Sequence, residues 1–151
     1  MTIAKRVRAF LSGGASRVEA PVADSRYAPE IDGEPDPGEV VWAWVPYEDD
    51  PTQGKDRPVL LLDTAGPDEG DGWVGLMLSS QDHDRDAEDE ARHGRHWMDV
   101  GTGAWDSQGR PSEVRLDRLI HLGRDAIRRE GAALDETVFR SVVEARRGLS
   151  R

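Results

Sequence analysis

Residues 37–63, PGEVVWAWVPYEDDPTQGKDRPVLLLD, constrain the fold of this chain more than any other segment. A strand-like run at 39–46 leads into a polar loop, and a second apolar run, 59–62, follows Arg57-Pro58 directly. The first run is apolar on both of its faces, which is typical of a strand that is covered on both sides. One side would form the core of a barrel. The other would be a subunit interface or would be covered by the N-terminal segment.

Arg57 stands at the mouth of the second run, with Pro58 as the predicted first residue of that strand. A guanidinium group there suits a phosphodiester, because its planar fork matches phosphate oxygens and stays charged at physiological pH. The alternative is a structural role, in which Arg57 caps the strand end or pairs with Asp50 or Asp56.

The rest of the chain indicates further short strands and one final helix. Apolar patterns predict strands at 72–79, 97–100, 113–122 and 126–133, while GTGAWDSQGRP predicts turns. Asp135 is a suitable N-cap for a last helix, with a buried stripe that consists of Val138, Phe139, Val142 and Val143. This order predicts a mainly β protein, a small SH3-like β-barrel with a C-terminal helix.

The N-terminal part differs in composition from the barrel region. Ile3, Val7, Phe10 and Leu11 recur at helical spacing and predict a short amphipathic helix that ends at Gly13-Gly14. Residues 15–37 are rich in proline and acidic residues and read as a linker. We therefore divide the chain into an N-terminal helix and acidic Pro-rich linker, 1–36, and a barrel domain, 37–151.

Composition limits the classes of function. The net charge is −10, and residues 24–106 carry 22 acidic and six basic residues, which argues against nonspecific nucleic-acid binding. An enzyme that acts on RNA would need a local basic pocket. The chain has no cysteine, which excludes disulfides and thiolate metal sites and fits a cytoplasmic protein. No apolar run is long enough to span a bilayer, so we expect no membrane association.

The order of three motifs resembles the PemK/MazF family of toxin endoribonucleases. PGEVVWAWVPY matches the family's "GDIVW" opening strand, GKDRPVLLLD its "G-x-x-RP-hydrophobic" strand, and WVGLMLSSQDHD a third strand that ends in Thr or Ser. EVRLDRLIHL and the helix after it fit the family's closing strand and terminal helix. The resemblance covers residues 37–147. It implies an SH3-like barrel that forms a homodimer, binds single-stranded RNA in a groove between subunits, and is inhibited by a cognate antitoxin protein.

The resemblance also implies site residues. The family uses the arginine at the position of Arg57 as its main catalytic residue, with a Thr or Ser that corresponds to Ser79, followed here by Ser80. The alternative for both serines is a hydrogen bond to backbone at the strand end. Lys55 and Gln81 flank these positions and are predicted to bind substrate. The implied reaction is metal-independent RNA cleavage by 2′-hydroxyl attack.

Residues 81–96 form a charged loop directly after the serines. We expect this loop to be mobile and to gate the cleft. His83 in this loop is a candidate acid or base, and Asp82 and Asp84 would favour its protonated form. The alternative is an exposed histidine with no catalytic role.

One departure from the family concerns the late strand. The family commonly carries an arginine there in a "QIRT"-like run, whereas this chain has LDRLIHL, with Ile120 or His121 near that position. RNA positioning would then pass to Arg115 and Arg118. The departure also keeps a second hypothesis open, a noncatalytic barrel that binds a peptide or another protein.

The sequence gives no support for a metal or a cofactor. Asp82, Asp84 and Asp86 have the spacing of an EF-hand loop, but Ala87 and His93 stand where that loop needs Gly and Glu. His93 and His96 lack the further ligands of a zinc site. No Gly-rich phosphate loop follows a strand, so no nucleotide cofactor is expected.

Overall fold

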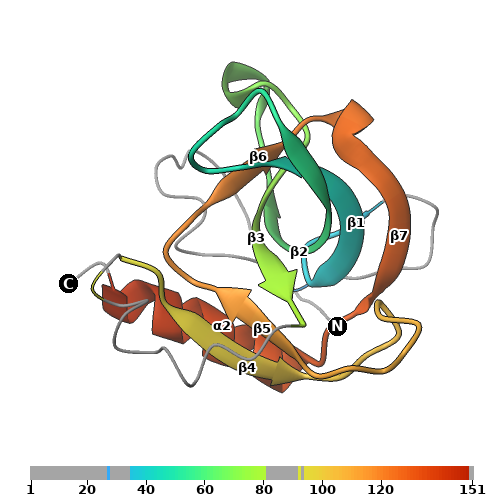
Figure 1. The fold of residues 1–151 in the computed structure, drawn as a ribbon, viewed down its shortest axis with the longest axis vertical. Coiled ribbons are helices and arrows are strands. Elements are labelled where there is room, and N and C mark those ends of the chain that lie inside the picture. Colours follow the sequence, from blue (N-terminus) through green and yellow to red (C-terminus); the bar gives the residue numbers. More distant parts are fainter. Residues whose placement is uncertain (1–26, 28–34, 81–91, 93, 150–151) are drawn as a thin grey trace.

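The structure is a computed structural model, and it describes residue 27, residues 35–80, residue 92 and residues 94–149. These residues form a curled sheet with one long C-terminal helix, which confirms the predicted mainly β fold (Figure 1). The predicted N-terminal helix and most of the linker lie outside the described residues.

The described residues contain seven strands that pair in antiparallel fashion. The strand order is β4-β5-β3-β2-β1-β7, with β6 beside β3. Two short 3-10 turns, η2 (Pro67–Glu69) and η4 (Arg124–Ala126), lie between strands. The strands are β1 (Glu39–Pro46), β2 (Gly54–Thr64), β3 (Trp73–Ser79), β4 (Trp97–Gly101), β5 (Ser112–Arg115), β6 (Ile120–Leu122) and β7 (Ile127–Ala133).

The second strand begins earlier than the sequence predicts. Residues assigned to the polar loop, from Gly54 to Arg57, pair with β1, and the ladder continues to Pro46 opposite Gly54. Pro58 therefore lies inside β2 rather than at its start. At Pro58, β2 pairs with β1 but not with β3, because the ladder between β2 and β3 begins at Val59. A proline is tolerated where a strand has a partner on one side only, since its missing N–H then disturbs the sheet least.

The strand predicted at 113–122 is divided in two. Both β5 and β6 run antiparallel to β3, with Val114 opposite Leu78 and Ile120 opposite Gly75. The segment between them leaves the ladder because its side chains bind elsewhere: Asp117 accepts a hydrogen bond from the His96 backbone at 2.6 Å, and Arg118 donates to the Pro46 carbonyl at 2.8 Å.

The sheet is buried on both faces. One face, inside the curl, has a core that consists of Val41, Ala43, Val45, Val59, Leu61, Trp73, Met77, Ile120 and Leu122. The other packs against α2 (Glu136–Leu149) around Val40, Leu60, Leu62, Leu76, Leu78, Val100, Trp105, Val114, Leu116, Leu134, Phe139, Val142 and Val143. Figure 1 shows α2 lying along β4 and β5 beneath the curled strands.

The terminal helix begins as predicted. The Asp135 carboxylate accepts hydrogen bonds from the backbone N–H groups of Thr137 and Val138 at 3.0 and 3.3 Å, which satisfies two groups that have no partner within the helix. Phe139 is fully buried and packs against Tyr27, whose hydroxyl donates to the Leu134 carbonyl. None of the helices in the described part of the chain is long and apolar enough to cross a membrane.

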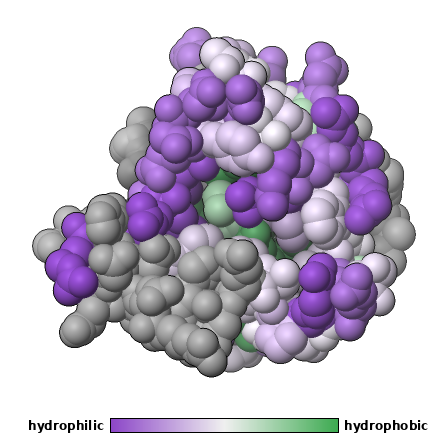
Figure 2. Space-filling model, viewed as in Figure 1, coloured by the Kyte–Doolittle hydropathy of each residue, from purple (hydrophilic) through white to green (hydrophobic). Residues whose placement is uncertain are grey.

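The surface in the orientation of Figure 1 is mostly hydrophilic. Figure 2 shows hydrophobic atoms gathered at the bottom of a hollow near the centre of this view, with strongly hydrophilic residues around it. Apolar side chains are thus concentrated inside the fold, and charged and polar side chains cover most of this face.

Candidate functional site

A cleft of about 590 Å³ opens where β2 begins and β3 ends. Three of the predicted catalytic residues and one of the predicted substrate-binding residues lie in this cleft. Its walls come from the first residues of β2, the last residues of β3, one residue of β1, and the segment that joins β4 to β5. The lining residues are Trp42, Lys55, Asp56, Arg57, Pro58, Leu78, Ser79, Ser80, Trp105, Asp106, Arg110 and Ser112.

The sheet register explains why Arg57 and Ser79 meet. The ladder between β2 and β3 ends with Val59 opposite Met77, so Arg57 and Ser79 each lie two residues beyond its last pair. Ser79 pairs with Glu113 of β5. The guanidinium and the hydroxyl therefore both line the cleft that opens where this ladder ends.

Arg57 is half-buried and makes no hydrogen bond or ion pair with the described residues. Neither acid that the sequence offers as a partner pairs with it, since Asp56 binds Arg128 at 3.3 Å and Asp50 accepts from Thr52. Partial burial lowers the pKa of Arg57 below the usual arginine value, Arg118 lowers this pKa further, and Tyr47 acts in the opposite direction. The site therefore holds a partly dehydrated cation that strongly favours an anionic partner.

The two serines differ in exposure. Ser79 is 9% exposed and belongs to the last position of β3, whereas Ser80 is exposed. Glu113 beside Ser79 is 5% exposed. Ser79 thus presents its hydroxyl from a fixed strand position, which favours a well-oriented hydrogen bond.

The segment between β4 and β5 contributes residues that the sequence did not single out. Asp106 accepts a hydrogen bond from Arg110 Nε at 2.8 Å, and this bond holds the pKa of Asp106 below its usual range. The Trp105 indole N–H donates to the Ser112 hydroxyl at 3.1 Å. Gly103 is required next to it, because a Cβ at that position would lie 2.0 Å from the Trp105 ring. The turns predicted from the segment GTGAWDSQGRP are present. Nothing in the composition of this segment indicates that its residues line the cleft.

The two arginines of the late strand have different surroundings. Arg118 lies near Arg57, as its effect on the pKa of Arg57 shows, and its guanidinium contacts the Met77 sulfur at 4.0 Å. Arg115 is 5% exposed and forms ion pairs with Glu48 at 3.0 Å and Asp117 at 2.8 Å. Arg115 does not line the cleft, and its predicted contact with RNA stays a prediction.

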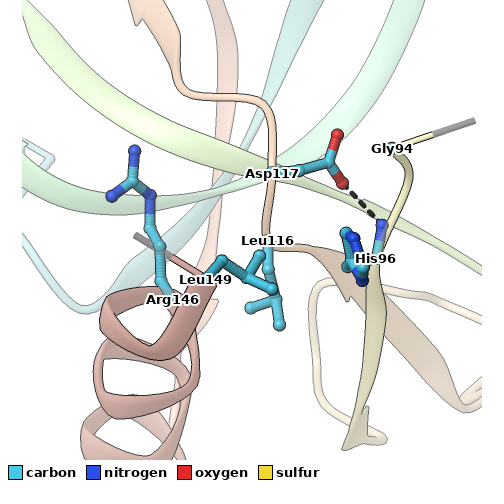
Figure 3. Close-up of a pocket in the computed structure, with 6 residues that line it drawn as sticks. All are labelled: Gly94, His96, Leu116, Asp117, Arg146 and Leu149. Atoms are coloured by element: carbon cyan, nitrogen blue, oxygen red, sulfur yellow. Dashed lines mark hydrogen bonds between the residues drawn. The ribbon is translucent and has the colours of Figure 1, made fainter. Parts of the chain in front are cut away.

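A second, smaller cavity of about 280 Å³ lies beside Asp117 (Figure 3). It is lined by Gly94, His96, Leu116, Asp117, Arg146 and Leu149. Figure 3 shows Leu149 and Leu116 between the helix and the strand, with Asp117 bonded to the His96 backbone. The Nε atom of Arg146 is buried and has no hydrogen-bond partner. Among the described residues, the predicted catalytic residues Arg57, Ser79 and Ser80 do not line this cavity.

Two of the predicted site residues, Gln81 and His83, lie outside the described residues, as does most of the predicted gating loop. So do the aspartates with EF-hand spacing and His93. In the part of the chain that the structure describes, no cluster of three or more His, Asp or Glu side chains could hold a metal ion.

Comparison with known proteins identifies one family. The sequence model described as PemK-like, MazF-like toxin of type II toxin-antitoxin system matches residues 36–147. This match covers the whole sheet and nearly all of α2. A search of curated proteins finds no match.

We predict that the ion pair between Asp117 and Arg115 makes the free energy of unfolding depend on pH in the acid range. Burial alone would raise the pKa of Asp117, but hydrogen bonds from Arg115 and the His96 backbone lower it below its usual value. The unfolded chain therefore takes up this proton at higher pH than the folded protein does. Asp117 stabilises the fold above about pH 4, and this contribution is lost as the pH falls through the lowered pKa.

We expect Asp117→Asn to lose about 1–3 kcal/mol of unfolding free energy at pH 7, because it leaves buried donors of Arg115 poorly paired. The variant should also show a weaker fall in stability between about pH 5 and pH 2 than the wild type. Urea unfolding across this range measures both. Asp125→Asn is the control, since Asp125 is exposed and has no hydrogen bond or ion pair with described residues. An unchanged acid dependence in Asp117→Asn would show that this carboxylate does not have a lowered pKa.

Proposed function

We propose that this chain, which belongs to the PemK-like, MazF-like toxin family of type II toxin-antitoxin systems, is a sequence-selective endoribonuclease that cleaves single-stranded RNA. Arg57 supports this most directly. Its guanidinium lies in an open cleft beside two serines and has no hydrogen bond or ion pair with the described residues. A half-buried cation that none of the described residues neutralises is suited to an anionic ligand such as a phosphodiester.

The proposed reaction uses the 2′-hydroxyl of the RNA as its nucleophile. Attack on the adjacent phosphorus builds negative charge on the non-bridging oxygens, and Arg57 would stabilise that charge. Partial burial strengthens this effect, because fewer water molecules screen the interaction. Ser79 would donate a hydrogen bond to a phosphate oxygen, with Ser80 beside it at the exposed rim.

Proton transfer needs groups other than Arg57, because the pKa of a guanidinium is too high for a free base at neutral pH. His83 is our candidate for the acid that protonates the leaving 5′-oxygen, on the strength of its place four residues after Ser79 in the sequence. The 2′-hydroxyl loses its own proton to solvent as the new O2′–P bond forms and the P–O5′ bond breaks, and with the 5′-oxygen protonated the products are a 2′,3′-cyclic phosphate and a 5′-hydroxyl end.

RNA would follow the basic residues of the cleft. Lys55 and Arg57 line it together with Arg110, which is paired with Asp106, while Asp56 is paired with Arg128 outside the cleft. Arg118, which does not line the cleft, is proposed to help position the RNA, and Gln81 is proposed to contact a base. Because the chain carries a net charge of −10, encounter with RNA should be slow and sensitive to salt.

Replacement of Arg57 tests this function. Arg57→Ala should abolish cleavage of single-stranded RNA, and Arg57→Lys should restore little, because lysine lacks the planar fork. Ser79→Ala should cost about 1.5–3 kcal/mol of transition-state stabilisation, equivalent to one hydrogen bond to a charged group. Gel and mass analysis of a mixed RNA pool gives the rates and the product ends. Cleavage should persist in EDTA, and RNA with a 2′-deoxy group at the cut site should be inert.

Arg140→Ala is the matched control, because Arg140 is exposed on α2, pairs with Glu136, and neither residue lines the cleft. This variant should cleave at nearly the wild-type rate. Equal cleavage by wild type and Arg57→Ala would remove Arg57 from the catalytic role. Absence of cleavage by the wild type itself would favour the noncatalytic, partner-binding barrel, the hypothesis to which the missing late-strand arginine points.

We propose two protein partners on the basis of family membership, a second copy of the chain and a cognate antitoxin. The tryptophan-rich face of β1 no longer argues for the dimer, since Trp42 is covered within the chain by Trp105 and Arg129. Light scattering at micromolar concentration should nevertheless give twice the chain mass, and the protein from its native host should co-purify with a small partner that blocks cleavage. A monomer that is purified alone and binds no protein from an adjacent gene would contradict both partner proposals.

A further inference from the structure

An exposed arginine covers the ring of a tryptophan that lines one wall of the cleft. Arg129 of β7 faces Trp42 of β1 in the sheet register, and its guanidinium carbon lies 4.8 Å from the centroid of the indole ring. Trp42 is half-buried and lines the cleft that contains Arg57, while Arg129 is exposed. The pair therefore stands where the proposed RNA site meets solvent.

The indole beneath Arg129 is held in place from within the protein. Its N–H donates to the Trp105 carbonyl at 2.7 Å. Trp105 is 3% exposed, its own N–H is bonded to Ser112, and its ring packs directly on Gly103. A ring fixed by such contacts loses little conformational entropy when a ligand stacks against it.

Arg129 has no competing partner among the described residues. Its neighbour Arg128 pairs with Asp56, whereas Arg129 makes no hydrogen bond or ion pair and only covers the ring. The outer face of its guanidinium is thus open to a planar ligand. Arginine planes and aromatic rings are the groups on which proteins stack the bases of single-stranded RNA.

We propose that Arg129 and Trp42 form a stacking subsite for one nucleobase of the RNA bound in the cleft. The base lies on the guanidinium, which is backed by the indole, so that three planar groups form one stack. A purine should be preferred over a pyrimidine because its larger ring overlaps more of the guanidinium. This inference rests on the proposed function, because it concerns the same RNA and the same cleft.

The first test measures the affinity for a nucleophile-blocked RNA, with a 2′-deoxy group at the cut site. Arg129→Ala should weaken binding about five- to 100-fold, the range expected for loss of one stacked base. Arg129→Lys keeps the charge but not the plane, and it should remain weak at high salt, where simple charge attraction is screened. Arg124→Ala is the matched control, since Arg124 covers Trp73 at 5.4 Å and Trp73, unlike Trp42, does not line the cleft.

The second test removes bases from the RNA. An abasic nucleotide placed at each position in turn should weaken binding to the wild type at one position in particular. At that position Arg129→Ala should cause no further loss, because the stack is already missing. Near-ultraviolet circular dichroism of each variant checks that Trp42 and Trp105 keep their packing.

The outcomes separate this inference from the function on which it rests. Wild type that neither binds nor cleaves RNA would overturn both. Wild type that cleaves RNA, with Arg129→Ala binding as tightly, would overturn the subsite and leave the function standing. Full recovery of affinity by Arg129→Lys at high salt would replace stacking with charge alone and would likewise overturn the subsite.

Discussion

Burial of the sheet on both faces decides where this protein can place polar groups. Val59 and Leu61 of β2 face the core inside the curl, while Leu60 and Leu62 face the core under α2. Removing this apolar surface from water is the main favourable contribution to folding, so both sets of positions are closed to charge. In β2 and β3 the polar side chains of the site therefore lie outside the apolar runs, among the first residues of β2 and at the last residue of β3.

This constraint explains why much of the site could be predicted from the sequence. The apolar run that follows Arg57-Pro58 begins inside β2, whereas the apolar run of β3 stops at Ser79, the end of that strand. Antiparallel pairing brings these two boundaries of apolar sequence near each other, although the choice of Ser79 itself came from the family resemblance. The terminal helix could also be predicted from the sequence, because Asp135 is a suitable N-cap and the apolar residues that follow it have helical spacing. These are local signals, and they depend on few assumptions about tertiary structure.

The rest of the site depends on contacts between segments that are far apart in the sequence. Local sequence patterns do not predict such contacts. Trp105 and Arg110 lie in turns whose composition predicts exposure, yet Trp105 is 3% exposed and closes the cleft. Arg115 forms ion pairs with Asp117 and with Glu48, which is far away in the sequence, and its predicted contact with RNA stays a prediction. The same ion pair and the hydrogen bond of Arg118 to Pro46 interrupt the strand that was predicted at 113–122.

The central claim is that single-stranded RNA binds at the ends of β2 and β3, and the tryptophan indole N–H groups can report on it individually. We expect a 2′-O-methyl oligoribonucleotide pool, which cannot be cleaved, to shift the nitrogen–proton NMR signals of Trp42, Trp105 and the Arg57 Nε–H together. The signal of Trp73, whose N–H is bonded to the Pro35 carbonyl at 3.1 Å and whose ring is not in the cleft, should stay in place. Shifts at Trp73 without shifts at Trp42, Trp105 and Arg57, or no shifts at RNA concentrations that saturate cleavage, would contradict this account.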